Sequence, residues 1–182
     1  MRAVGRKAMT TNSMKLYKLI ILYFLHKAKQ EITNATLSDF ILQYGYTNYF
    51  SIQETLAALT EDNMIYTSHT HAASYYTIAE KGLETLQFFS YQLPKDTMRQ
   101  IDDYLAENKI QITNTASIRT DYTKTPSNEY LVRCTVLEHG DTMAEIAITL
   151  PTEEMAISAC DRFKKKNSDI YRYLFKSLTM DH

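Results

Sequence analysis

In the first half of the chain, the spacing of hydrophobic residues changes from helical to strand period in a fixed order, and this order constrains the fold most strongly. Apolar residues first recur every three or four positions over residues 14–29, as on one face of an amphipathic helix. Two more helical stretches follow, over about 34–44 and 47–63. The segments 64–68 and 75–78 are rich in aromatic and β-branched residues, which favours strands.

Local signals mark where these elements end. Thr36 and its neighbours can accept hydrogen bonds from the free amides of the second helix. Gly45 can adopt the left-handed conformation that ends this helix, and Thr47 or Asn48 can cap the third. A hairpin whose short tip spans 69–73, followed by a fourth helix, completes the pattern of a winged helix-turn-helix.

The second half begins after Leu93-Pro94 and is predicted to contain helices around an antiparallel sheet. The expected elements are a helix ending near Asn108, strands over about 110–118, 130–137 and 143–150, a loop over 121–128, a turn at 139–141, and two helices separated at 167–169. The predicted fold class is therefore α+β: a winged helix-turn-helix followed by a small α-β-β-β-α-α domain. We expect a basic arm over 1–13, the winged helix over 14–92, and a dimerisation or sensing domain over 93–182.

A short motif closes the predicted hairpin. The chain runs Tyr76-Thr77-Ile78-Ala79-Glu80-Lys81-Gly82, which resembles the Tyr-x-Leu-Thr-Glu-Lys-Gly run that closes the wing in PadR-like and MarR-like winged-helix regulators. Ala79 stands where those families usually have a helix-capping Thr. The fourth helix is therefore predicted to be less well capped at its start.

Over its whole length, the chain resembles a family of small bacterial proteins of unknown function. The segments that suggest this are Leu19–Tyr23, Gly45–Phe50 and Tyr171–Leu174. The resemblance implies a winged helix paired with a C-terminal α/β half. The resemblance implies no particular activity, because no activity is settled for that family.

The net charge of -1 is unevenly distributed along the 182 residues. Three basic and no acidic residues occur in 1–13, whereas 14–92 holds five basic and seven acidic, and 93–182 holds twelve basic and fourteen acidic. Lysine and arginine supply most nonspecific affinity for DNA. A winged helix with a negative net charge therefore needs cations from other parts of the protein to bind DNA.

The third helix sharpens this problem, because it carries no lysine or arginine and its outward face is predicted to hold Phe50, Glu54, Ala57 and Glu61. Glutamate can accept a hydrogen bond from the cytosine amino group, provided that nearby cations offset its charge. Lys18 could contribute such a charge. The residues predicted to contact DNA are Arg2, Arg6, Lys7, Lys15, Thr47, Asn48, Tyr49, Ser51, Gln53, His69 and His71.

Several of these residues have a simpler structural interpretation. Thr47 and Asn48 can be helix caps, Tyr49 and Phe50 can pack in a core or dimer interface, and the two histidines can be wing surface rather than metal ligands.

Other residues in the chain also have a simpler structural interpretation. Cys134 and Cys160 fit small buried side chains in a reducing compartment better than a redox or metal site. The cluster Arg162 and Lys164–Lys166 fits the end of a helix, where cations complement the dipole, or else a phosphate-binding patch.

The motifs predict no catalytic residues, no metal site and no cofactor. The sequence has four glycines and no glycine-rich phosphate loop. We expect a cytoplasmic protein without membrane spans. The leading hypothesis is a homodimeric transcriptional regulator that binds double-stranded DNA, with a possible small-molecule or protein effector at the C-terminal domain. The alternatives are a winged-helix adaptor that contacts proteins only, and an enzyme with a pocket in the second half.

Overall fold

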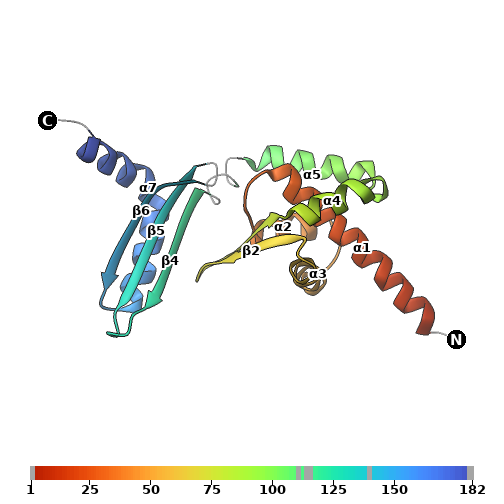
Figure 1. The fold of residues 1–182 in the computed structure, drawn as a ribbon, viewed down its shortest axis with the longest axis horizontal. Coiled ribbons are helices and arrows are strands. Elements are labelled where there is room, and N and C mark those ends of the chain that lie inside the picture. The colour runs from red at the N-terminus through yellow and green to blue at the C-terminus, as the bar shows by residue number, and fades with distance from the viewer. Residues whose placement is uncertain (1–2, 110–111, 113–116, 139–140, 180–182) are drawn as a thin grey trace. The chain divides into compact units, whose positions relative to one another are not determined.

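The computed structural model describes residues 3–109, 112, 117–138 and 141–179, with side chains from residue 13 onward. The described residues form an α+β protein with two three-stranded sheets, in the orders β1-β3-β2 and β4-β5-β6 (Figure 1). The chain divides into two compact units. The first unit contains residues 1–68 and 73–112, and the second contains 69–72 and 113–182.

The first unit contains five α-helices among its described residues. Its elements are α1 (Ala3–Ala28), β1 (Ile32–Thr33), α2 (Asn34–Gln43), α3 (Tyr49–Glu61), β2 (Ile65–His69), β3 (Ser74–Ile78), α4 (Glu80–Phe89), the short 3-10 helix η1 (Ser90–Gln92) and α5 (Lys95–Glu107). Strand β1 pairs antiparallel with β3, where Ile32 lies opposite Tyr76.

Helix α1 forms the centre of this unit and packs against α3, α4, α5 and β3. Its segment Leu19–Leu25 is buried apart from Tyr23 and supplies much of the core. The centroid of the Phe24 ring lies 5.1 Å from the ring centroid of Phe40 on α2 and 5.9 Å from that of Tyr104 on α5. Such aromatic contacts stabilise the packing beyond the area they bury. Helix α5 is therefore part of this core.

The helix ends follow the local chemistry of the sequence. Thr33 caps α2, because its hydroxyl accepts from the Thr36 amide at 3.2 Å. Gly45 has φ +68° just after α2, as predicted. Ala79 precedes α4 and forms no side-chain cap. This agrees with the prediction from the motif after the hairpin, in which Ala79 replaces a capping Thr.

Gly82 of this motif lies where the hairpin and α4 meet. A Cβ at this position would be 2.1 Å from the Met64 carbonyl oxygen and 3.0 Å from the Leu22 side chain. The same carbonyl accepts a hydrogen bond from the Ala79 amide at 3.0 Å. The motif therefore requires glycine here because the backbone before β2 approaches α4 too closely for any side chain.

The second unit is an antiparallel sheet with a helix on one face. It contains β4 (Ile118–Lys124), β5 (Tyr130–Glu138), β6 (Asp141–Leu150) and α7 (Glu153–Thr179). Helix α7 packs mainly on β4 and β5. Val132 and Cys134 of the sheet form a small core with Ala156, Cys160 and Phe163 of the helix.

The predicted strand over 110–118 is wrong in most of its described part. Ile112 and Ser117 are helical, and β4 begins at Ile118. The Ile112 amide donates to the Asn108 carbonyl, and the Ile112 side chain is buried in the core of the first unit. Residues 110, 111 and 113–116 lie outside the described residues. Alternating apolar residues near the end of a helix cannot by themselves distinguish a strand from another helical turn.

The predicted exposed loop over 121–128 is also too long. Strand β4 continues to Lys124, because Asp121–Lys124 pair with Tyr130–Arg133 of β5. The connection is a tight turn, in which the Thr125 amide donates to the Glu129 carbonyl and Asn128 has φ +67°. The antiparallel pairing of the next two strands is confirmed, whereas residues 139 and 140 of their predicted turn lie outside the described residues.

The two helices predicted at the end of the chain are one helix, α7. Asn167, Ser168 and Asp169 do not interrupt it, since none is Gly or Pro and their helix propensities are only modestly unfavourable. The second unit is therefore β-β-β-α among its described elements, rather than α-β-β-β-α-α. Lys164–Lys166 lie in the middle of α7, so their interpretation as a helix end is wrong.

The boundaries of the first helix and of the second half also differ from expectation. Helix α1 begins at Ala3, so the described part of the expected arm continues this helix. The predicted boundary followed Leu93-Pro94, whereas helix α5 groups with the first unit. Ile101 of α5 is fully buried in the first core, which explains this grouping.

Candidate functional site

Helix α3 is fixed from one side and exposed on the other. Asn48 caps it, accepting from the Ser51 amide at 3.0 Å, as the structural interpretation of this residue predicted. Ile52, Leu56 and Leu59 are buried in the first core. This packing positions the opposite side of the helix as a surface.

The exposed face of α3 holds the residues that the helical spacing placed there. Phe50 is 81% exposed, and Glu54, Ala57 and Glu61 are exposed along the same helix. We call these four residues the α3 face. It combines one exposed aromatic ring with two carboxylates and contains no basic side chain.

Two lysines near the end of α3 are already engaged. The Lys18 ammonium lies 2.7 Å from the Asp62 carboxylate, and the Lys81 ammonium donates to the Asp62 carbonyl at 2.8 Å. The hydrogen bond from Lys18, together with its charge, lowers the pKa of Asp62. Lys18 therefore neutralises the charge of Asp62. Lys18 is then less able to offset the negative charges of Glu54 and Glu61.

Gln53, one of the predicted DNA contacts, is held by another side chain. Its amide exchanges two hydrogen bonds with that of Asn34, at 2.9 and 3.2 Å. Asn34 also donates to the Tyr76 hydroxyl at 3.2 Å. This network joins the starts of α2, α3 and β3. Sequence reasoning missed it, because no local pattern links residues 19 positions apart.

The other predicted DNA contacts are dispersed. Lys15 and Tyr49 are exposed, whereas Thr47 and Ser51 are partly buried. His69 and His71 are exposed and group with the second unit, in which the His71 amide donates to Asp121 at 2.7 Å. The centroids of the His71 and Tyr122 rings lie 4.1 Å apart. The side chains of Arg2, Arg6 and Lys7 lie outside the described residues.

Tyr66 was not among the predicted contacts, although the sequence contained a signal for it. In a strand, successive side chains alternate between faces. The neighbouring Ile65 is buried, so Tyr66 points outward. The alternation could have predicted this aromatic ring on the hairpin, which is 66% exposed.

Side chains that ligate metals do not cluster in the part of the chain that the structure describes. Among the side chains that the structure describes, no three His, Cys, Asp or Glu residues form a group that could hold a metal ion. Cys134 and Cys160 are both free and buried.

No helix in the described residues combines the length and apolar character that a bilayer crossing requires.

Comparison with known proteins gives the family and no function. Neither the comparison with curated proteins nor that with solved structures found a significant match. A family model matches residues 17–178, which include most of both units. The chain therefore belongs to the family described as "Domain of unknown function (DUF4364)".

Proposed function

We propose that the first unit is a winged helix-turn-helix that binds double-stranded DNA, and that two copies act together as a transcriptional regulator. The observation that carries this proposal is the element order α1-β1-α2-α3-β2-β3 with the sheet order β1-β3-β2. In this arrangement a short turn through Gly45 joins α2 to α3, and a hairpin follows α3. The exposed α3 then takes the place of the recognition helix.

Charge decides how such a protein would bind. The α3 face brings two carboxylates toward phosphates, so it needs compensating cations. Lys15 on α1 is exposed, and Arg2, Arg6 and Lys7 precede it in the sequence. A two-fold arrangement of copies would double this positive charge. We assign the second unit to dimerisation or effector sensing.

The test is binding of the full-length protein to a random 30-base-pair duplex, followed by fluorescence anisotropy across a salt series. With four phosphates neutralised per copy and two copies bound, the logarithm of the binding constant should fall with a slope of about -7 against the logarithm of salt concentration. A variant in which Arg2, Arg6 and Lys7 are alanine should bind more weakly with a shallower slope. Absence of binding at the lowest salt concentration contradicts the proposal.

The matched control removes three exposed cations from α7, in the variant with Lys164, Lys165 and Lys166 changed to alanine. This variant should bind DNA nearly as well as the unaltered protein. If it loses binding while the N-terminal variant does not, the DNA contact belongs to the second unit, and the winged-helix assignment of function is wrong. Sedimentation of the unaltered protein tests the dimer.

A second candidate function is a winged-helix adaptor that contacts proteins only. The observation that favours it is the α3 face, where Phe50 lies exposed with Glu54 and Glu61. Aromatic residues are enriched in protein interfaces. The double variant Glu54→Gln/Glu61→Gln separates the two functions. A DNA-binding protein should bind more tightly when this repulsion is removed, whereas an adaptor should bind DNA in neither form.

A further inference from the structure

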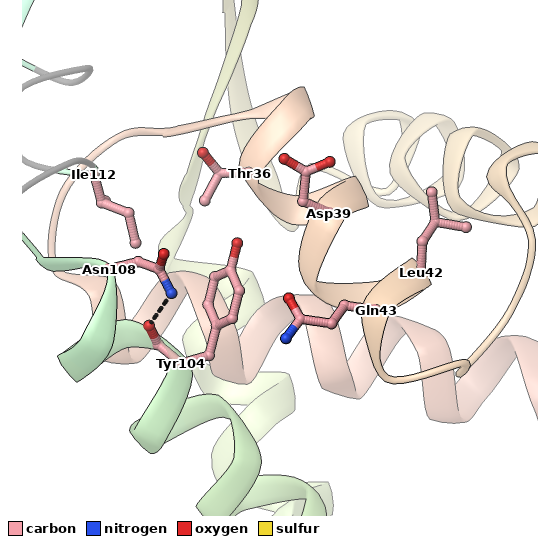
Figure 2. Close-up of a pocket in the computed structure, with 7 residues that line it drawn as sticks. All are labelled: Thr36, Asp39, Leu42, Gln43, Tyr104, Asn108 and Ile112. Atoms are coloured by element: carbon pink, nitrogen blue, oxygen red, sulfur yellow. Dashed lines mark hydrogen bonds between the residues drawn. The ribbon is translucent and has the colours of Figure 1, made fainter.

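A pocket in the first unit lies between α2 and the end of α5 (Figure 2), and no residue of the α3 face is among its described lining residues. Its volume is about 430 Å³, within the range of sites that hold small organic molecules. Helix α2 contributes Thr36, Asp39 and Gln43, and α5 contributes Tyr104 together with Asn108 just after its end. Leu42 and Ile112 add apolar surface.

Tyr104 offers a polar group to an occupant of this pocket. The residue is only 7% exposed, and its hydroxyl has no hydrogen-bond partner among the described residues. Figure 2 shows this hydroxyl pointing between Thr36 and Asp39. The hydroxyl oxygen is not one of the fully buried polar atoms without a partner, so it opens into the pocket. It is therefore free to bond a molecule there.

Asn108 and Asp39 offer acceptors to this pocket. The Asn108 amide nitrogen donates to the Tyr104 carbonyl at 2.9 Å, which leaves its oxygen as an acceptor (Figure 2). Asp39 is exposed and forms no ion pair with any described cation. Burial, the charge of Asp39 and Tyr44 raise the pKa of Tyr104, so its hydroxyl stays protonated at neutral pH. The pocket therefore extends from a surface carboxylate to a core hydroxyl.

Charge selects the chemical class of ligand. Among the described residues, Asp39 is the one charged side chain that lines the pocket, and no described lysine, arginine or histidine lines it to hold an anion. A single carboxylate with amide and hydroxyl groups is a poor site for a metal ion, which needs several ligands. A protonated primary amine has one positive charge and three N–H donors, which matches one carboxylate and two or three neutral acceptors.

We propose that this pocket binds a small organic molecule through a protonated primary amine, with Asp39 as its counter-ion and Tyr104 and Asn108 as further acceptors. The apolar part of the ligand lies along the Tyr104 ring and the side chains of Leu42 and Ile112. This site does not depend on DNA binding by the α3 face. It lies in the first unit, and Tyr104, Asn108 and Ile112 belong to the range 93–182 in which the sequence led us to expect an effector.

The experiment uses the full-length protein labelled with ¹⁵N. Putrescine and tyramine are the amine probes, whereas glycerol, acetate and inorganic phosphate test neutral and anionic ligands. The side-chain amide signals of Gln43 and Asn108 report binding inside the pocket. We expect an amine probe to shift both signals at millimolar concentration, and the other three compounds to leave them unchanged.

The Asp39→Asn variant should weaken binding of the amine at least about tenfold, as expected for loss of a charged hydrogen-bond acceptor. Tyr104→Phe should weaken it less, because one neutral acceptor is lost. The matched control is Asp103→Asn, which removes an exposed carboxylate of α5 that does not line the pocket. Both Asn variants keep the shape of the side chain at an exposed position, so the fold is retained.

Three results overturn the assignment. The first is the absence of any shift with either amine at about 10 mM, a concentration that detects even weak binding. The second is equal binding of the amine by the unaltered protein and by Asp39→Asn. The third is a preference of the pocket for glycerol or phosphate over both amines.

Discussion

The Lys18 ammonium and the Asp62 carboxylate, 44 positions apart, lie 2.7 Å from each other and join α1 to the end of α3. Because this contact lowers the pKa of Asp62 in the folded protein, its contribution to stability is present above the unfolded pKa near 3.8. It is lost as the pH falls through the lower, folded value.

The first prediction follows from this pH dependence. Asp62→Asn should be less stable than the unaltered protein at pH 7, and the difference should shrink as the pH falls below the unfolded pKa near 3.8 and through the lower folded pKa. Urea unfolding at several pH values measures this. Glu61→Gln changes a neighbouring exposed carboxylate and is the control. A difference that persists unchanged at pH 3 would mean that the ion pair is not its cause.

The second prediction concerns Gly82. Gly82→Ala should destabilise the protein by about 3 kcal/mol, because the added Cβ meets a backbone carbonyl rather than a flexible side chain. Gly45→Asn is the control, since its surroundings are open and Asn tolerates the left-handed conformation. Denaturant unfolding compares the two variants. Equal stability of both would show that the Met64 carbonyl can move away at little cost.

The third prediction is a coupling between Asn34 and Gln53. Because the two amides satisfy each other, removing either one should cost about 1 kcal/mol, and removing both should cost less than the sum. Unfolding of Asn34→Ala, Gln53→Ala and the double variant gives the coupling energy. Gln87→Ala, at an exposed position, is the reference. Strictly additive effects would contradict the pairing of these side chains.

The fourth prediction concerns the two cysteines. Burial raises the pKa of Cys134 to about 11 and also raises that of Cys160. The thiolate is the reactive form, so both cysteines should react slowly with a disulfide reagent in the folded protein and quickly in denaturant. Because the folded pKa is raised, the contribution of Cys134 to stability should decline as the pH rises from about 9 toward 11. Rapid modification of the folded protein at pH 8 would contradict the burial.

The fifth prediction tests the continuity of α7. Ser168→Pro should disrupt the helix, at a cost of about 3 kcal/mol for proline in a helix interior, whereas Ser168→Ala should be neutral or slightly stabilising. Circular dichroism and urea unfolding measure the helix content and stability of both variants. If the chain broke between two helices near Ser168, proline there would be tolerated.

The features predicted correctly depend on neighbouring residues. The cap by Asn48, the left-handed Gly45 and the missing side-chain cap at Ala79 each involve only a few consecutive positions. The inward and outward sides of α3 follow from helical spacing alone. These local patterns were sufficient to predict an α+β protein with a buried core behind α3.

The features that sequence reasoning missed depend on tertiary contacts. The pairing of Asn34 with Gln53 brings two helix starts together, and the buried Ile112 belongs to a core formed by residues far away in the sequence. The continuity of α7 through Asn167 depends on packing over a sheet, which compensates for weak local propensity. The pocket around Tyr104 likewise exists only after α2 and α5 have packed.

The two sides of α3 have different consequences for how the family can diversify. The inward residues Ile52, Leu56 and Leu59 hold the helix in the core, whereas Phe50, Glu54, Ala57 and Glu61 contribute little to packing. Mutations on the outward side can therefore accumulate at small thermodynamic cost. The chemistry of this surface can therefore change between family members without a prior gain in stability.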